Sequence, residues 1–208
     1  MSPKTDRRSK QGLESRLRII EATFEIAHEL GYQGTSIAKV SARSGLPASS
    51  VYWHFADKDE LFAEVLQHSF DQWLETMPAW EPPTIGEGLR EAVSLRIRSA
   101  VKSIASSPEF WRLGLMLALE RQAIEPEARR RFIEIRRSVL DSLAAFWDQA
   151  LPAGHSERSP GMPALFARFT MATSDGIFIS AQIDDEFDLL LLADLLIDSL
   201  EAAAKRLA

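Results

Sequence analysis

The chain of 208 residues contains no cysteine, which excludes disulfide bonds and thiolate ligands for a metal. Long apolar runs are missing as well. The most hydrophobic segment, FDLLLLADLLIDSLEAA, carries three aspartates and is too short and too charged to span a bilayer. The first eighteen residues are basic and polar with no apolar run behind them, so no signal peptide is predicted. We therefore expect a cytoplasmic protein with no membrane partner.

Signatures of catalysis are also missing. The four histidines, His28, His54, His68 and His155, are scattered, and none lies three or four residues from another, so no helical pair of metal ligands is predicted. The sequence has no glycine-rich phosphate loop, nucleophile elbow or zinc motif. We expect a protein that is not an enzyme and that holds no cofactor and no metal ion.

Negative charge predominates, with a formal net charge of −6, but its distribution is uneven. Residues 1–58 hold nine Lys and Arg against six Asp and Glu, a local charge of +3. Residues 59–208 hold fifteen against twenty-four, a local charge of −9. A basic N-terminal part on an acidic body indicates that only the N-terminal part approaches a polyanion.

Strand patterns are scarce, whereas apolar residues recur at helical spacing along most of the chain. Gly31 and Gly45 are suited to left-handed C-caps, and Thr35 and Asp57 are suited to N-caps. Four helices are predicted first, at residues 12–30, 36–44, 48–54 and 58–77, and five follow, at residues 87–106, 108–121, 126–150, 163–182 and 187–207.

The turn SGLP, residues 44–47, joins the second and third of these helices and contains the glycine that a tight turn between helices requires. This is the sequence pattern of a helix-turn-helix. Val51 and Phe55 are four residues apart and are expected to face inward. The residues left on the outward face are Ala48, Ser49, Tyr52 and Trp53.

The outward face offers groups that suit contacts with DNA. Ser49 and Ser50 carry hydroxyls, and the amide groups at a helix start can meet a phosphate. Tyr52 can donate its hydroxyl to a phosphate, and Trp53 presents an apolar edge to a thymine methyl group. Lys58 adds a positive charge where a DNA backbone strand passes. Short helical pairs with a glycine turn also occur in other proteins, so the pattern alone leaves the function open.

The stretch GTSIAKVSARSGLPASSVYWHFADKDELF resembles the N-terminal signature of the tetracycline-repressor (TetR) family of bacterial transcription regulators. The resemblance covers about residues 12–66, and TSDGIFIS is similar to an Asp-Gly pair that recurs in the penultimate helix of that family. It implies an all-α fold and a DNA-binding role. The positions that it implies as DNA contacts are Thr35, Ser49, Tyr52, Trp53, His54 and Lys58.

Two departures from the family pattern alter the expected contacts. Ala48 stands where a lysine or arginine often adds affinity for the DNA backbone, and Trp53 replaces a tyrosine, which makes that contact more apolar. A basic tail could compensate by reaching an adjacent groove, although such a tail is also typical of a solvated chain end. The tail residues are Lys4, Arg7, Arg8 and Lys10.

The rest of the chain carries bulky apolar and aromatic residues on helical stripes, a pattern typical of an ordinary core. The family resemblance implies a pocket for a small molecule among them, and an apolar or aromatic effector is expected. The candidate lining residues are Trp73, Met77, Phe110, Met116, Val139, Leu143, Phe169 and Thr173.

The last two helices are apolar on more than one side, so a monomer would leave an apolar face exposed, which usually marks an interface. Two such helices from each subunit would form a four-helix bundle about a two-fold axis, and we expect a homodimer. A dimer also places two recognition helices in successive major grooves of a palindromic operator in double-stranded DNA.

The sequence therefore predicts an all-α protein with two domains. A three-helix helix-turn-helix DNA-binding domain with its basic tail occupies residues 1–57, and a larger helical ligand-binding and dimerisation domain occupies residues 58–208. The predicted function is a dimeric, ligand-responsive transcription regulator, a repressor released from its operator by the effector. The alternative is a helical carrier of small molecules whose N-terminal helices dock a protein partner.

Overall fold

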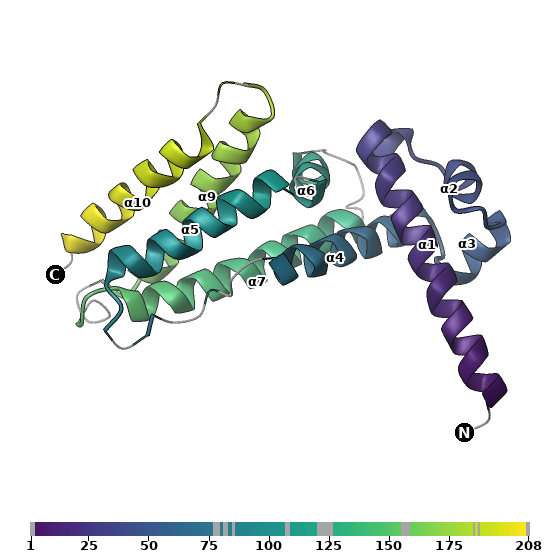
Figure 1. The fold of residues 1–208 in the computed structure, drawn as a ribbon, viewed down its shortest axis with the longest axis horizontal. Helices are drawn as coiled ribbons and strands as arrows, with labels where there is room; N and C mark the ends of the chain where they lie inside the picture. Colours follow the sequence, from purple (N-terminus) through teal and green to yellow (C-terminus); the bar gives the residue numbers. More distant parts are fainter. Residues whose placement is uncertain are drawn as a thin grey trace. The chain divides into compact units, whose positions relative to one another are not determined.

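The computed structural model describes residues 3–76, 80, 83–84, 86–106, 109–119, 127–154, 159–184, 186 and 188–206. All regular secondary structure in these ranges is helical, which confirms the all-α prediction (Figure 1). No helix in the same ranges is long and apolar enough to cross a bilayer.

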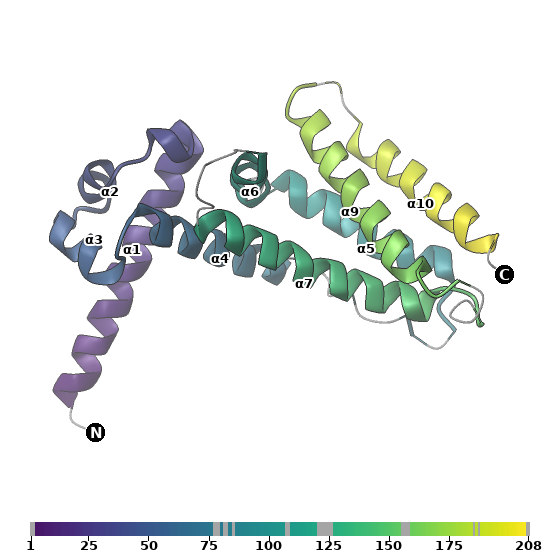
Figure 2. The ribbon, with the colours of Figure 1, turned by 180° about the vertical axis from the view of Figure 1, so that it is seen from behind.

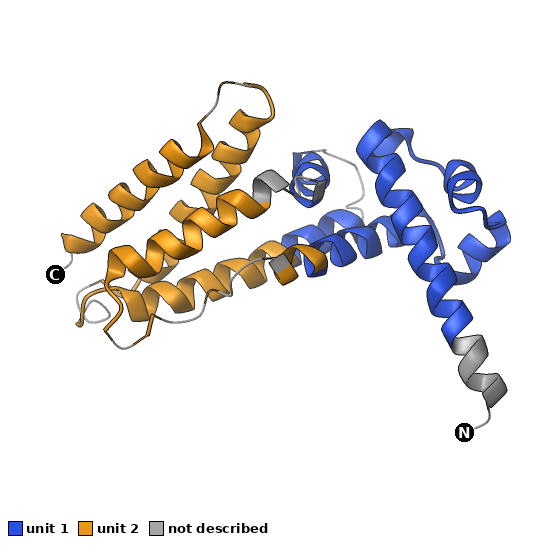
Figure 3. Ribbon diagram, viewed as in Figure 1, with its two compact units in different colours: residues 1–71, 109–134 blue, residues 72–108, 135–208 orange. Residues whose placement is uncertain are grey.

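The chain divides into two compact units (Figure 3). Unit 1 contains residues 1–71 and 109–134, and unit 2 contains residues 72–108 and 135–208. Two helices, α4 (Lys58–Thr76) and α7 (Glu127–Ala150), therefore contribute residues to both units. Unit 1 therefore contains the N-terminal helices together with segments from later in the sequence. The domain boundary after residue 57 stays a prediction.

The first helix, α1 (Pro3–Gly34), begins before the predicted start at residue 12 and includes the backbone of the basic tail. It is kinked at Gly31, whose φ of 68° and ψ of −177° are not helical. The positive φ favours glycine because a Cβ would be strained there. The predicted break at Gly31 is therefore present, but one further turn follows it.

Helices α2 (Ile37–Ser44) and α3 (Ala48–His54) form the helix-turn-helix and lie on the same side of α1 (Figures 1 and 2). Gly45 ends α2 in the left-handed region with a φ of 67°, as predicted. The predicted N-cap is wrong by one residue, because Ser36 accepts from the amide of Lys39. Thr35 is buried and donates its hydroxyl to the Gly31 carbonyl at 2.8 Å.

Asp57 and Asp59, on either side of the first residue of α4, have different roles. Asp57 accepts from the amides of Asp59 and Glu60, both at 2.9 Å, which confirms the predicted N-cap. Asp59 accepts from the amides of Glu127 and Ala128 at 2.5 and 3.2 Å. Asp59 thereby caps α7 from a different helix and fixes the start of α7 within unit 1.

The core of unit 1 also includes α6 (Glu109–Leu119), which packs close to the start of α7. Phe110 is buried among aromatic rings, with ring centroids 5.4 Å from Phe70 and 5.8 Å from Phe132. A Cβ at Gly114 would overlap the ring of Phe132. Glycine at this position therefore leaves room for the Phe132 ring of α7 directly against the backbone of α6.

Unit 2 is built from α5 (Leu89–Ser106), α9 (Met162–Ala181), α10 (Leu189–Lys205) and the later part of α7. Figures 1 and 2 show α9 and α10 running side by side in opposite directions. Phe146 and Trp147 are fully buried at the centre of its core, and the Trp147 ring lies 4.8 Å from that of Phe166. The apolar stripes of the second half of the chain therefore form an ordinary packed core to a large extent.

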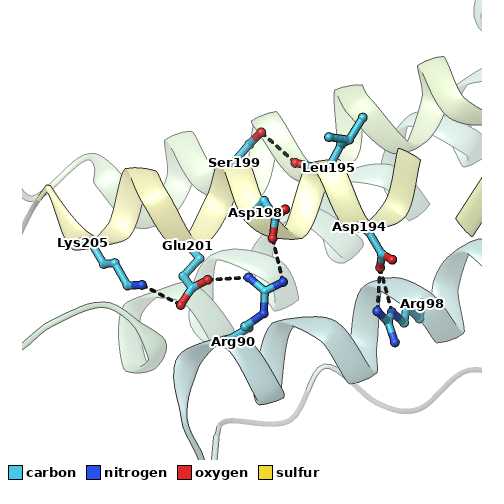
Figure 4. A network of polar contacts seen from close by, with 8 residues as sticks. All are labelled: Arg90, Arg98, Asp194, Leu195, Asp198, Ser199, Glu201 and Lys205. Atoms are coloured by element: carbon cyan, nitrogen blue, oxygen red, sulfur yellow. Dashed lines mark hydrogen bonds and ion pairs between the residues drawn. The ribbon is translucent and has the colours of Figure 1, made fainter. Parts of the chain in front are cut away.

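Ion pairs join α5 to α10 (Figure 4). Arg98 donates two hydrogen bonds to Asp194, at 2.9 and 2.7 Å. Arg90 reaches Asp198 at 2.7 Å and Glu201 at 2.6 Å. Exposed pairs contribute at most about 1 kcal/mol each, but together they fix which face of α10 is directed toward α5.

Candidate nucleic-acid interface

The third helix presents an inward and an outward face as the sequence predicts. Val51 and Phe55 are buried in unit 1. Ser49 is exposed and Ser50 is half-buried, so the start of the helix offers small polar groups to solvent. The rings project farther, because Tyr52 is 57% exposed and Trp53 is 76% exposed. Such exposed aromatic groups beside hydroxyls suit contacts with base edges and phosphates.

Two ring residues at the end of α3 are held by α1. A Cβ at Gly12 would lie 4.0 Å from two ring atoms of Trp53, so α1 supports one edge of the exposed indole. The ring of His54 lies edge-to-face with that of Trp53, with centroids 4.5 Å apart. His54 Nε2 lies 2.7 Å from Ser15 Oγ, and the same hydroxyl lies 2.9 Å from the Gly12 carbonyl.

The electrostatic surroundings of His54 favour its neutral form. Burial lowers the pKa of its imidazole from the ordinary value, and the nearby Arg16 guanidinium lowers it further. Ser15 has a single hydroxyl hydrogen, and its donation to the Gly12 carbonyl leaves His54 Nε2 as the donor to Ser15. The ring then has its proton on Nε2 and an unprotonated Nδ1.

We expect the folded protein to bind the His54 proton only below the ordinary histidine range near pH 6.5. The unfolded chain binds that proton first as the pH falls, so stability is lost below about pH 6.5 and retained above it. NMR titration of the His54 ring signals checks the midpoint. A His54→Gln variant should show a weaker loss of stability over the same acidic range. A His54 midpoint at or above the ordinary value would contradict the assignment.

Lys58 and Thr35, both predicted to contact DNA, are engaged within unit 1. The Lys58 ammonium donates to the Tyr32 carbonyl at 2.7 Å and lies 4.0 Å from the centroid of the Tyr32 ring. Thr35 is 3% exposed, and its hydroxyl is bonded to the Gly31 carbonyl. Contacts of these two residues with DNA stay predictions. The observed contacts of Lys58 hold the end of α1 against α4, and that of Thr35 closes the turn after Gly31.

Several other cations of unit 1 have partners within the unit. Arg43 lies between Glu25 and Glu29, at 3.0 Å from each, and these hydrogen bonds, that to Glu29 first, raise the pKa of Arg43. Arg16 pairs with Glu64 at 2.6 Å. Arg18 donates to the carbonyl at the end of α2. Arg43 and Arg18 therefore join α1 to α2, and Arg16 joins α1 to α4.

The basic tail begins α1. In the described part of the tail, Lys10 is exposed, while the side chains of Lys4, Arg7 and Arg8 lie outside the described residues. The backbone of residues 3–11 is helical and continuous with the rest of α1, whereas a solvated chain end would be irregular. Its contact with an adjacent groove stays a prediction.

The predicted effector residues are divided between the units. Phe110 and Met116 belong to unit 1, whereas Trp73, Val139, Leu143, Phe169 and Thr173 belong to unit 2, and Met77 lies outside the described residues. Leu143 is buried in the core of unit 2 and Val139 packs against it. Trp73 is buried, and Thr173 is half-buried. Phe169 is 47% exposed and faces away from that core.

Sequence reasoning missed a charged side chain in the interior of unit 2. Arg96 of α5 is buried, donates to the Ala92 carbonyl at 2.8 Å and reaches Glu87 at 3.3 Å. Its guanidinium lies 4.9 Å from the ring centroid of Phe146. A hydrogen bond from the Thr84 amide and the contact with Arg96 lower the pKa of Glu87. Helical periodicity places Arg96 on the buried side of α5, which is the signal that points to it.

Helices α9 and α10 present an exposed apolar surface, here called the α9–α10 surface. Its α9 residues recur every three or four positions and so share one helix face. A hollow of about 280 Å³ lies on this surface, between Phe169 and Leu165 of α9 and Ser199 and Ala203 of α10. The exposed residues of the surface are Leu165, Phe169, Ala172, Gly176, Ile179, Leu191, Leu195, Ser199 and Ala202.

Comparison with known proteins relates this arrangement to bacterial regulators. Residues 19–65 match the family model described as "Bacterial regulatory proteins, tetR family". The "Fatty acid metabolism regulator protein" of Bacillus subtilis (strain 168) is 21% identical over 196 residues, which are 92% of this chain and 96% of that protein.

Solved structures share the fold over most of the chain. The transcriptional regulator FadR from Bacillus subtilis in complex with stearoyl-CoA has a TM-score of 0.63 at 20% identity and covers 88% of this chain and 96% of its own. AibR in complex with isovaleryl coenzyme A and operator DNA has a TM-score of 0.62 at 18% identity, with the same coverage of 88% and 96%.

Proposed function

We propose that this chain, which belongs to the TetR family of bacterial regulatory proteins, is a homodimeric transcription repressor that releases a palindromic operator when a small effector binds. The observation that carries the proposal is the outward face of α3. It combines a hydroxyl at the helix start with two exposed rings, Tyr52 and Trp53, and is anchored inward by Val51 and Phe55. A helix of this kind is suited to the major groove.

The recognition face supports a division of roles between its residues. The amide groups at the start of α3 and the hydroxyl of Ser49 suit a phosphate and set the register on the duplex. Tyr52 suits a second phosphate, and Trp53 suits a thymine methyl group in the groove. Ser15 and Gly12 of α1 position the His54 and Trp53 rings, so sequence preference is expected to depend on α1 as well as on α3.

The partner proposed for the α9–α10 surface is the same surface of a second copy. Its large apolar residues border small ones, Ala172 and Gly176 on α9 and Ser199 and Ala202 on α10, which lets helices from two subunits approach closely. Contact between identical surfaces about a two-fold axis is closed, so neither subunit keeps a free copy of the α9–α10 surface for a third chain. A dimer of this kind presents two recognition helices to a palindrome.

For the effector we propose an acyl thioester of coenzyme A. The FadR and AibR structures with coenzyme A thioesters, and the fatty acid regulator of similar length, support this class. The core of unit 2 is apolar and aromatic, as an acyl chain requires, and the buried Arg96 adds a cation suited to a polar or anionic part of the ligand.

Release of DNA follows from linkage between the two sites. An effector that binds better to an arrangement in which the two recognition helices do not fit successive major grooves shifts the population toward it and lowers operator affinity. Helix α4 is the proposed lever, because it begins beside the recognition helix and supplies residues to both units.

The test uses palindromes from the DNA that flanks the protein's own gene. Fluorescence anisotropy should show binding whose logarithm falls linearly with the logarithm of salt concentration, because phosphate contacts release counterions. Long- and short-chain acyl-CoA should release the DNA, whereas free coenzyme A, which has the same charged part, should not. If the affinity for duplex DNA does not change with salt concentration, the proposal is contradicted. That result would favour the alternative function, a helical carrier of small molecules.

A further inference from the structure

The side chain of Asp59 joins the start of α4 to the start of α7, entirely within unit 1. Its Oδ2 accepts from the amide of Glu127 at 2.5 Å, and its Oδ1 accepts from the amide of Ala128 at 3.2 Å. The residue before α7 in the sequence is Pro126, whose side chain has no acceptor. Because the first amides of a helix have no partner within it, a carboxylate supplied by α4 completes the start of α7.

The start of α4 is in turn attached to the recognition helix. Phe55, which follows α3 directly, is buried, and its amide donates to the Val51 carbonyl at 2.9 Å. The Lys58 ammonium donates to the Tyr32 carbonyl of α1 at 2.7 Å. Asp59 lies four residues after Phe55, so a displacement of the start of α4 bears directly on the end of α3.

Helix α7 carries one apolar stripe through both units (Figure 3). Phe132 is fully buried in unit 1, and the stripe continues in unit 2 at Ile135, Val139, Leu143 and Phe146. These positions recur every three or four residues, so they share one face of a single helix of 24 residues. A continuous helix that is packed in this way moves as a rigid element, and a displacement of its later part reaches its first turn.

A second attachment holds α7 to α9 within unit 2. The Arg136 guanidinium donates to both carboxylate oxygens of Asp175, at 2.9 and 2.5 Å, and both side chains are mostly shielded from solvent. Bidentate pairs of this kind are the strong and directional form of an ion pair. Asp175 directly precedes Gly176 of the α9–α10 surface. Helix α7 is therefore attached to α4 at its start and to α9 near its middle.

We propose that Asp59 is a positioning residue that transmits effector binding in unit 2 to the recognition helix by way of α7. The inference rests on the proposed function, because its outcome is release of the operator, and it adds α7 to α4 as a route. An effector that packs among the core side chains of unit 2 displaces α7. The two hydrogen bonds to Asp59 carry that displacement to the start of α4 and the end of α3. Without the carboxylate the two helices shift independently, so the operator still binds but the effector no longer releases it.

The test measures affinity for the palindromes that flank the protein's own gene, with and without saturating stearoyl-CoA or isovaleryl-CoA. The ratio of the two dissociation constants, here called the release factor, is expected to be about 5- to 150-fold for the unmodified protein. Asp59→Ala should keep the effector-free affinity within about threefold and lower the release factor toward one. Asp59→Asn keeps a side-chain oxygen acceptor without the charge and should restore most of the release factor. Calorimetry without DNA should give similar acyl-CoA affinities for all three proteins.

Asp57→Ala is the matched control. It removes the same charge two residues earlier, together with a carboxylate that also caps a helix start, since Asp57 accepts from the amides of Asp59 and Glu60. Each alanine variant should lower the Tm by about 2–4 °C, but only Asp59→Ala should lose the release factor. An undiminished release factor in Asp59→Ala, or an equal loss in Asp57→Ala, would overturn the proposal.

A second experiment, without effector, separates this inference from the proposed effector class. Asp175→Asn breaks the bidentate pair with Arg136 and so perturbs α7 from within unit 2. It should change operator affinity by about fivefold or more in the unmodified protein and by less than about twofold in Asp59→Ala. Equal changes in the two proteins, or no change in either, would overturn the inference, whereas a lack of release by acyl-CoA alone contradicts only the proposed effector. A protein that binds none of the palindromes would contradict the proposed function, and this inference with it.

Discussion

Replacing Leu195 by glutamate is expected to convert the protein to a monomer and to lower its operator affinity at least about a hundredfold. Leu195 is 53% exposed on the α9–α10 surface, so the single chain tolerates the carboxylate. In the proposed dimer the carboxylate would be buried against apolar groups, once in each subunit. A desolvation cost of about 3 kcal/mol is already a hundredfold. Sedimentation at micromolar concentration gives the mass, and anisotropy gives the operator affinity.

Two further variants make this test specific. Leu95→Glu changes an equally exposed leucine of α5 in the same unit and should leave the protein dimeric. Gly176→Leu is expected to favour the folded monomer by up to about 1 kcal/mol, because it replaces a helical glycine and nothing lies within 4 Å of its Cβ. It should nevertheless weaken the dimer if α9 approaches its counterpart closely. An unmodified protein that sediments as a monomer would contradict the two-fold arrangement.

The recognition helix could be predicted closely because its determinants are local. The predicted bounds, residues 48–54, match α3, which follows the predicted turn, and the four-residue spacing of Val51 and Phe55 predicts its inward face. The tertiary supports of that helix had no comparable signal. Ser15 and His54 are 39 residues apart, and only the packing of α1 on α3 brings them together.

The wrong N-cap shows how burial and a hydrogen bond to the preceding turn decide between two neighbouring residues that are equally suited to cap a helix. Thr35 and Ser36 are both suited to begin α2. Thr35 is drawn into the interior by its hydrogen bond to Gly31, which leaves Ser36 to accept from the Lys39 amide. Composition was equally insufficient for the effector residues. A bulky apolar side chain such as Phe169 is compatible with a core, a pocket or an interface, and only the fold places it on an exposed surface.

Alanine substitutions of Trp53 and Lys58 are expected to have different effects, although the sequence suggested that both contact DNA. Trp53→Ala should lower operator affinity by about ten- to a hundredfold, since each lost base contact contributes about 1–3 kcal/mol. The free energy of unfolding of the Trp53→Ala variant should change by less than about 0.5 kcal/mol, because the Trp53 ring is 76% exposed. Operator titrations and thermal unfolding of each variant measure the two quantities separately.

Lys58→Ala should instead destabilise unit 1. It removes a hydrogen bond from an ammonium to the Tyr32 carbonyl and a cation–π contact with the Tyr32 ring, together about 2 kcal/mol or more. Lys58→Met retains the apolar stem and is the matched control for its packing. If operator affinity falls only in proportion to unfolding, Lys58 positions α4 against α1. If Lys58→Ala keeps full stability and the slope of log affinity against log salt concentration becomes shallower by about one, Lys58 contacts a phosphate, as the sequence suggested.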